Sequence, residues 1–423
     1  MKKALCLVLV LAMILCTAAA TAEGKAIDGQ GKRDIKINPA GLNEVEPGVS
    51  PTTGRNLAEI EVPNGYLGLT VTGEYQPIMV QISNADNGLG SSSGVKVYRN
   101  APVNGVYADV VYEALQKRGG GETRMSMIFS DVVPDYVGFV RSTRITHVLL
   151  RKEWECAFCT SGYNYAVKDI PDAWKLTGVP DPSGKRTQQD PGIAYVGDMS
   201  SKPWGPCVLR IFDRTGTRYA SANSELFDLV TLLTDVVPKD HTPANHTFKF
   251  TDELPTGGDE GNIVYVKFGN EYNTDSRLEY DPANNVYIRY IKQKKGEDLP
   301  YRSNVLVSPE KKKVTKDGKN VNGMGMVIQG LEAGEPITFS NVIIQGIEMK
   351  WKGSGRPDPT LVGSGNADYF MGGRHIAGVW ERKDLDSRTV FYGDDGNEIE
   401  LQRGRTLIIL MPYAEQKAGV SYE

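Results

Sequence analysis

The stretch TRMSMIFSDVVPDYVGFVRSTRITHVLLRKEWECAFC, residues 123–159, decides the fold class that we expect for the first half of the chain. It opens with a run rich in Met, Ile and Phe at 123–129, which predicts a strand. Residues 136–140 predict a second strand, and the short apolar run at 156–159 predicts a third. Between the strands predicted at 136–140 and 156–159, the spacing of hydrophobic residues changes from that of a strand to that of a helix.

That change of period gives the best helix prediction of the chain, over residues 142–153. Ile145, Val148 and Leu149 fall at helical spacing, and Ser142 can cap the start. A helix between strands indicates an α/β arrangement.

Outward from this segment, the run PIMVQIS at residues 77–83 alternates between apolar and polar positions and predicts another strand. The Gly, Ser and Asn residues of 84–94 predict a loop. Residues 224–236 predict a second helix, because their leucines fall on one stripe.

The pattern changes beyond residues 238–261, a polar segment with Pro and Gly in which we place the domain boundary. Period-two runs separated by turns such as Asp395-Gly396 follow it, at residues 263–268, 287–290, 341–350 and 406–411. We therefore expect an α+β protein. An α/β N-terminal domain with a mixed sheet and helices would span residues 65–240, and a β-rich, mainly antiparallel C-terminal domain residues 255–415.

The N-terminus has the features of a secretory signal peptide, which we place at residues 1–22. Two lysines precede a short apolar run, and Ala20-Thr21-Ala22 provides a cleavage site. Lipidation at Cys16 is the alternative, and only in that case do we expect peripheral association with a membrane. Residues 23–64 predict a flexible tether that ends in an ordered turn, Ser50-Pro51-Thr52-Thr53-Gly54. The expected location is extracytoplasmic.

The composition narrows the class of protein. The 423 residues include 48 basic and 52 acidic side chains, for a net charge of −4. This balance excludes a protein that binds nucleic acid through bulk charge. We expect no nucleic-acid partner and no cofactor.

Several motifs occur in a characteristic order: the turn at 50–54, ADVVYEA at 108–114 with TRM at 123–125, VGFVRSTR at 137–144, and later LVGSG at 361–365 and GVW at 378–380. This ordered set resembles the YerB-like family of bacterial extracytoplasmic proteins, usually described as lipoproteins. The resemblance covers roughly residues 50–415. It implies an α/β first domain and a β-rich second domain, both of unknown function, and it implies no reaction.

Arg141 and Arg144 are the most informative pair of candidate site residues. They lie at the predicted helix start, where the partial positive charge makes Arg unfavourable by about 0.3–1 kcal/mol. A bound carboxylate or phosphate would compensate for this cost. An internal ion pair with Glu113, Asp109 or Asp131 would do the same, so both interpretations stay open.

Asp109, Glu113 and Arg124 form the second group of candidates. Glu113 lies in an apolar run, where a carboxylate is rarely buried unless it is paired. It is either the structural partner of Arg124 or Arg141, or a general acid with a raised pKa. No second carboxylate at a convincing spacing supports a glycosidase.

The Cys and His residues predict no redox or metal site. Cys156 and Cys159 fall in a predicted strand rather than at a helix start, so we expect buried thiols, with a disulfide to Cys207 as the alternative. The histidines match no metal-ligand spacing; they are His147, His241, His246 and His375.

Together these features predict a non-enzymatic binding module, secreted or associated with the cell envelope, for an anionic cell-wall component or a protein partner. The expected ligand site comprises Arg141, Arg144, Arg124, Asp109, Glu113 and Ser142. The first alternative is an envelope hydrolase that uses Glu113 or Asp109 as acid/base. The second is a scaffold that holds a partner through a β edge.

Overall fold

The structure is a computed structural model of the whole chain. It describes residues 24–27, 32–84, 89–92, 95–98, 102–118, 123–160, 196–197, 208–212, 225–268, 275–291, 298–303, 306–316, 319–328, 334–412 and 419–423. Both the predicted signal peptide and Cys207 lie outside these residues.

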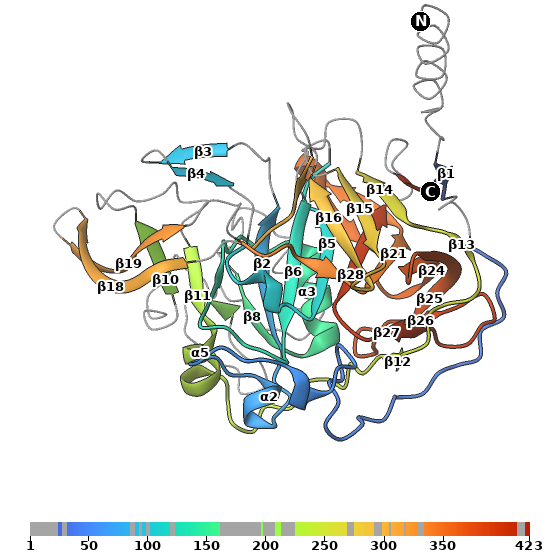
Figure 1. Ribbon diagram of the computed structural model, residues 1–423, viewed down its shortest axis with the longest axis horizontal. Helices are drawn as coiled ribbons and strands as arrows, with labels where there is room; N and C mark the ends of the chain where they lie inside the picture. Colours follow the sequence, from blue (N-terminus) through green and yellow to red (C-terminus); the bar gives the residue numbers. More distant parts are fainter. Residues whose placement is uncertain are drawn as a thin grey trace, which may run out of the picture.

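One sheet of 11 strands runs through the molecule and joins the two halves of the chain (Figure 1). Its order is β13 (Asp259–Glu260), β25 (Arg374–Arg382), β24 (Gly363–Met371), β21 (Asn341–Ile347), β28 (Thr406–Pro412), β5 (Val110–Leu115), β6 (Thr123–Phe129), β2 (Ile78–Asn84), β8 (Ala157–Cys159) and β9 (Val196–Gly197), with β26 (Val390–Tyr392) on β25. The two halves meet where β28 pairs in parallel with β5, with Thr406 opposite Val110.

The central strands of this sheet are buried on both faces. On β28, Leu407 and Ile409 belong to one hydrophobic cluster, while Ile408 and Leu410 belong to another. Continuous apolar runs are typical of strands that are covered on both sides. Helix α3 (Ile145–Trp154) packs into the second cluster.

A second sheet contributes to the first cluster. Its order is β1 (Lys25–Ala26), β29 (Gly419–Tyr422), β14 (Ile263–Lys267), β15 (Ser276–Asp281), β16 (Val286–Ile291) and β17 (Leu299–Pro300), with β20 (Thr338–Phe339) on β16. The apolar side chains of Val264, Leu278 and Tyr287 in this sheet are fully buried. The first and last described strands of the chain, β1 and β29, are therefore neighbours (Figure 1).

The remaining strands form one five-stranded sheet and three pairs. The five-stranded sheet has the order β18 (Leu306–Lys316), β19 (Lys319–Ile328), β10 (Val208–Phe212), β11 (Glu225–Asp228) and β7 (Tyr136–Gly138). The pairs are β12 (Lys249–Thr251) with β27 (Glu400–Gln402), β22 (Met349–Lys352) with β23 (Arg356–Pro359), and β3 (Leu89–Ser92) with β4 (Val95–Tyr98).

The predicted α+β class is confirmed in its broad sense. Strands dominate, and α3 is the one helix of eight or more residues in the described ranges. The strand predicted at 123–129 coincides with β6, and the helix predicted over 142–153 corresponds to α3.

Two local predictions were wrong in part. The helix predicted over 224–236 begins as strand β11, which pairs with β7 and β10, and turns helical only at Leu229. Asp228 sets this start, because its side chain accepts a hydrogen bond from the Thr231 N–H at 2.9 Å. The loop predicted at 84–94 contains β3, which forms a hairpin with β4.

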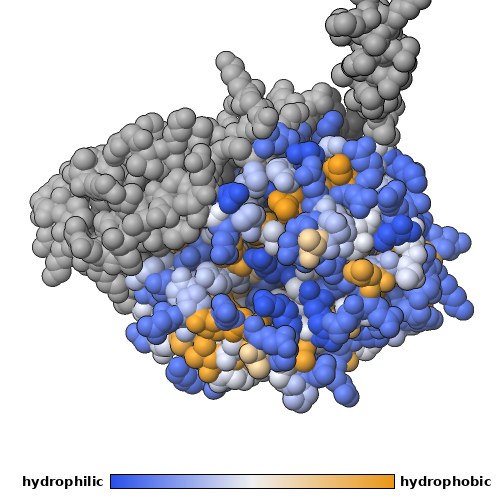
Figure 2. Space-filling view, in the orientation of Figure 1, coloured by the Kyte–Doolittle hydropathy of each residue, from blue (hydrophilic) through white to orange (hydrophobic). Residues whose placement is uncertain are grey.

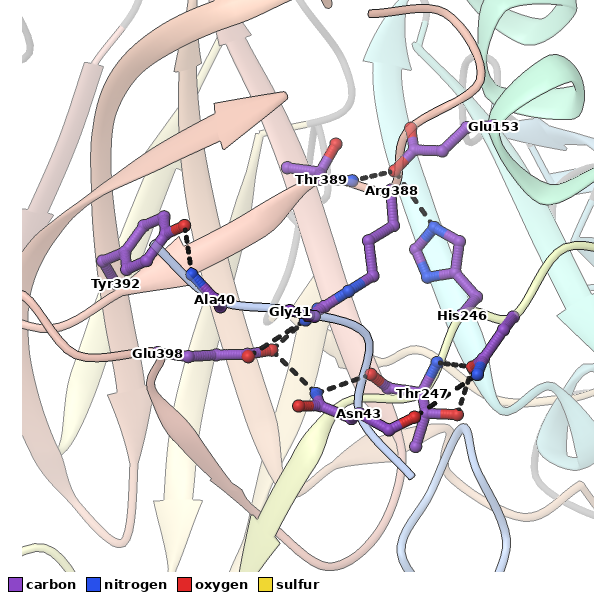
Figure 3. A network of polar contacts seen from close by, with 11 residues as sticks. Ala40, Gly41, Asn43, Glu153, His246, Thr247, Arg388, Thr389, Tyr392 and Glu398 are labelled. Atoms are coloured by element: carbon purple, nitrogen blue, oxygen red, sulfur yellow. Dashed lines mark hydrogen bonds and ion pairs between the residues drawn. The ribbon is translucent and has the colours of Figure 1, made fainter. Parts of the chain in front are cut away.

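The segment predicted to be a flexible tether also differs, because residues 33–43 lie against the second half of the chain, and Figure 3 shows Ala40, Gly41 and Asn43 of this segment. We call these residues the N-terminal strap. Arg33 donates to the buried Asp368 carboxylate at 2.7 Å. Arg388 pairs with Glu398 at 2.7 Å and donates to the Gly41 carbonyl at 3.0 Å. The polar composition of the strap therefore reflects specific hydrogen bonds.

Within the described ranges, no helix combines the length and the apolar composition needed to cross a bilayer.

Candidate functional site

Glu113, on β5, is fully buried and accepts hydrogen bonds on both carboxylate oxygens. Its Oε1 accepts from Asn84 at 2.8 Å and from Thr123 at 2.7 Å. Arg289 of β16 donates to Oε1 at 3.1 Å and to Oε2 at 2.9 Å. The partner is therefore Arg289 and not Arg124 or Arg141, which corrects the expectation. This ion pair links the first half of the chain to the second.

Asp109 lies just before β5 in a buried cluster with Asp131. Its Oδ2 accepts from the Ser130 N–H at 2.6 Å, the Ser130 hydroxyl at 2.7 Å and the Asp131 N–H at 3.0 Å. Burial raises the pKa of the Asp109 carboxyl well above its ordinary value, and the neighbouring Asp131 carboxylate adds to the rise. With 4% of its surface exposed, Asp109 is almost fully buried.

The N-cap of α3 lies two residues later than expected. Arg144 is the N-cap in extended conformation, and the helix begins at Ile145. Ser142 is therefore not the cap. Instead His147 Nδ1 accepts from the Arg144 N–H at 3.1 Å. Burial lowers the pKa of His147 well below its ordinary value, and the charges of Arg124 and Arg144 lower it further.

Arg124 and Arg144 both lie beside Ser142. Arg124 donates to the Ser142 carbonyl and, at 3.1 Å, to its hydroxyl. Arg144 donates to the Thr143 carbonyl at 2.8 Å and reaches the Ser142 hydroxyl at 3.4 Å. Arg141 donates its backbone N–H to the Gln81 carbonyl at 2.8 Å.

The predicted acidic and basic residues do not meet in one site. Glu113 pairs with Arg289, Asp109 binds Ser130, and Asp131 accepts from the hydroxyls of Ser50 and Thr53 at 2.6 Å each. The binding role of Arg141 and Arg144 stays a prediction.

The turn predicted at residues 50–54 belongs to a closed loop, residues 48–57, which we call the Ω-loop. Val49 and Asn56 form a β-bridge at its neck, and the Leu57 N–H donates to the Gly48 carbonyl at 2.9 Å. At its tip, Ser50 and Thr53 bind Asp131 of the first half. Gly54 takes a φ of +65°, a conformation that favours glycine.

The second half of the chain holds the other side of the Ω-loop. The Gly404 N–H donates to the Thr53 carbonyl at 2.7 Å, and Arg403 donates to the Gly54 carbonyl. The chain turns outward at the next residue, so the Arg55 side chain is exposed.

An open cavity of about 750 Å³ lies between the Ω-loop and the second half of the chain. We call it the basic cavity because Arg55, Arg403 and Arg405 line it. Its acidic lining residues are Glu59 and Asp252, and Asp252 pairs with Arg403 at 2.8 Å. The remaining wall comes from neutral residues such as Thr338 and Ser340.

The guanidinium groups in the basic cavity are not equivalent. Arg405 is half-buried, donates to the Val106 carbonyl and bonds Thr338 Oγ1 at 3.0 Å. Burial lowers its pKa to about 10, and the charge of Arg55 contributes to the lowering. The Arg55 guanidinium has no hydrogen bond or ion pair among the residues that the structure describes. An anion would therefore meet an available guanidinium here.

Two further cavities have different linings. One of about 860 Å³ is bordered by exposed carboxylates such as Glu253, Asp394 and Glu400. The other, of about 880 Å³, lies at α2 (Leu69–Thr72) and is largely apolar, with Val45 and Val71 in its wall. Figure 2 shows hydrophobic residues in this lower part of the molecule, where Figure 1 places α2 and α5 (Leu229–Thr231).

Sequence reasoning missed the basic cavity, because its arginines lie far apart in the chain. A signal was present in Arg403-Gly404-Arg405, two cations separated by one Gly, and in Arg55 directly after a predicted turn. In the described residues, no group of three or more His, Cys, Asp or Glu side chains is placed to hold a metal.

The fold and these contacts define a class: a protein of two sequence domains that share one sheet. Residues 69–195 match the N-terminal domain, and residues 264–408 the C-terminal domain, of a protein of unknown function designated DUF3048. The chain belongs to this two-domain, YerB-like family.

The crystal structure of the YerB protein from Bacillus subtilis is similar, with a TM-score of 0.56 and 18% sequence identity. The match covers 88% of this chain and 99% of that one, and at this identity it supports the fold alone. No curated protein is similar enough to match the chain.

Proposed function

We propose that this protein is a non-enzymatic binding module of the cell envelope that takes an anionic cell-wall component in the basic cavity. The observation that carries the proposal is the cavity itself, which is open and is lined by Arg55, Arg403 and Arg405. The proposed extracytoplasmic location rests on the leader-like N-terminus, residues 1–22.

The chemistry of the lining favours phosphate or carboxylate groups. Guanidinium forks bind such anions through paired, charge-assisted hydrogen bonds. Thr338 and Ser340 add hydroxyls in the same wall, which suit the sugar or polyol oxygens of a wall polymer. The exposed position of Arg55 allows a long ligand to pass over the surface.

The geometry gives less support to a hydrolase based on Glu113 or Asp109. Glu113 is 0% exposed and Asp109 4% exposed, and both carboxylates accept several internal hydrogen bonds. A general acid must reach the leaving group directly or through one water. Neither side chain meets this condition.

Isothermal titration calorimetry of residues 23–423 with a glycerol phosphate hexamer tests the proposal. We expect Arg55→Ala to weaken binding about tenfold to a hundredfold, because hydrogen bonds to charged groups contribute about 1.5–3 kcal/mol. Glu59→Gln should tighten binding, because it removes a negative charge from the cavity wall.

The matched control is Lys267→Ala, which removes one exposed positive charge on β14, outside the cavity. It should bind like the wild type. Equal affinity for Arg55→Ala and the wild type would contradict the proposed site. The absence of binding to the hexamer, with a neutral muropeptide bound instead, would contradict the anionic ligand.

A further inference from the structure

We propose that an anion in the basic cavity locks the Ω-loop onto the body of the protein, so that ligand binding fixes the chain leading to the N-terminal strap. This inference rests on the proposed function, because it assumes that the same cavity takes the anion. It adds a coupling between binding and the position of the N-terminal segment.

The basic cavity is a composite of two parts of the chain. The Ω-loop and the helical turn after it supply Arg55, Asn56 and Glu59. The second half supplies Arg403 and Arg405 on the opposite wall. If the Ω-loop leaves, one of the three guanidinium groups leaves with it, and the cavity loses a wall.

The contacts that hold the Ω-loop include hydrogen bonds from small side chains, from the backbone and from the Arg403 guanidinium. Its tip is attached to Asp131 through the hydroxyls of Ser50 and Thr53, and to Gly404 through the Thr53 carbonyl. Hydrogen bonds of this kind contribute about 0.5–1.5 kcal/mol each, and up to about 3 kcal/mol when one partner is charged. Local opening of such a loop costs less than global unfolding.

Arg55 meets charges of both signs when the Ω-loop docks. Closure brings it near Arg405, whose pKa is lowered by burial and further by the Arg55 charge. Closure also brings it near the Asp131 carboxyl, where the Arg55 charge partly offsets the rise in pKa that burial causes. Arg403 on the opposite wall pairs with Asp252. An anion between Arg55 and Arg405 adds two attractions that exist only while the Ω-loop is docked. Because it binds the closed form more tightly, it must also shift the equilibrium toward that form.

Docking of the Ω-loop also restrains the chain on the N-terminal side of the loop. The neck of the loop is closed by one hydrogen bond, from the Leu57 N–H to the Gly48 carbonyl, and by the bridge between Val49 and Asn56. Residues 44–47 connect the N-terminal strap to this neck. A closed neck therefore fixes the C-terminal end of this connection.

Amide hydrogen exchange with the glycerol phosphate hexamer tests the coupling. The amides to follow are those of Ser50, Gly54 and Leu57, which donate to carbonyls within the Ω-loop at 2.9 Å each. If opening destroys the site, their exchange should slow about 100-fold at a ligand concentration of 100 times Kd. The His241 amide, in a separate turn, is the internal control and should keep its rate.

Variants separate the coupling from the binding itself. Arg55→Ala should abolish the slowing, whereas Lys267→Ala should retain it. Ser50→Ala/Thr53→Ala removes the hydroxyls that bind Asp131 and leaves every arginine in place. It should speed exchange of the loop amides and weaken calorimetric affinity.

The outcomes distinguish this inference from the proposed function. Binding with unchanged exchange in the Ω-loop would overturn the coupling and leave the binding site standing. Unaltered affinity in the Ser50→Ala/Thr53→Ala variant, with its loop amides exchanging freely, would also overturn the coupling. Absence of binding to the hexamer would overturn both.

Discussion

The buried ion pair between Glu113 and Arg289 leads to a sharp prediction for stability. The two side chains are 0% and 1% exposed and belong to different halves of the chain. Arg289→Met should destabilise the protein by about 3–5 kcal/mol, because removal of one partner leaves a buried charge uncompensated. Glu113 would keep only its hydrogen bonds from Asn84 and Thr123.

The double variant Glu113→Gln/Arg289→Met should recover most of this loss. Gln keeps an oxygen that can accept from Asn84 and Thr123, and no buried charge remains. Arg289 Nε also lacks a partner in the described structure, so Met removes an unsatisfied donor. We expect the double variant to lie within about 1–2 kcal/mol of the wild type.

Urea unfolding followed by tryptophan fluorescence and circular dichroism measures these free energies. The matched control is Arg277→Met on the neighbouring strand β15, where the ion pair with Glu279 is 30% and 33% exposed. This substitution should lower the free energy of unfolding by at most about 1 kcal/mol. A loss below about 1 kcal/mol for Arg289→Met, or no coupling energy in the double-mutant cycle, would refute this reasoning.

Three further predictions concern single residues. Asp109→Asn should raise the free energy of unfolding at pH 7 and lose this advantage below pH 3.8. The folded-state pKa of Asp109 is raised above 3.8, so the unfolded chain loses this proton first and folding becomes less favourable as the pH rises. Urea unfolding at pH 3 and at pH 7 tests the sign of this effect. Gly54→Ala should lower the free energy of unfolding by about 1–3 kcal/mol and weaken anion binding, because φ is +65° and a Cβ would overlap the Phe250 ring. An unchanged melting temperature would contradict this geometry. Cys156 should resist iodoacetamide at pH 8 in the native state and react in urea, because burial raises the pKa of its thiol to about 12; mass spectrometry of the labelled protein measures both rates.

Local pattern predicted the elements whose burial is regular. The run at 123–129 gave β6 because alternate positions face two different clusters, and Ile145, Val148 and Leu149 gave α3 because they share one packed face. Leu226 was assigned to a helix because it falls on one helical stripe with Leu229, Val230 and Leu233, and Phe227 lay inside the same predicted helix. Leu226 and Phe227 are both fully buried, on a strand paired on two sides, and only the tertiary structure decides between the two periods.

Contacts between residues far apart in the chain could not be predicted from the sequence. Glu113 was correctly expected to need a partner if buried, but Arg289 lies 176 residues away and carries no local mark of that role. The basic cavity was hidden for the same reason, because Arg55 and Arg405 come together only when the Ω-loop docks. The strap shows that low hydrophobicity does not by itself indicate disorder, since Arg33 finds a buried carboxylate.

The pairing of β28 with β5 has a consequence for the order of events during synthesis. Strand β5 is made early, yet its parallel neighbour, residues 406–412, is among the last parts of the chain to appear. Until then β5 presents an apolar open edge, which is a template for wrong pairing. The sheet cannot close until residues 406–412 are free to pair with β5, and deletion of these residues should trap the molecule as an aggregation-prone intermediate.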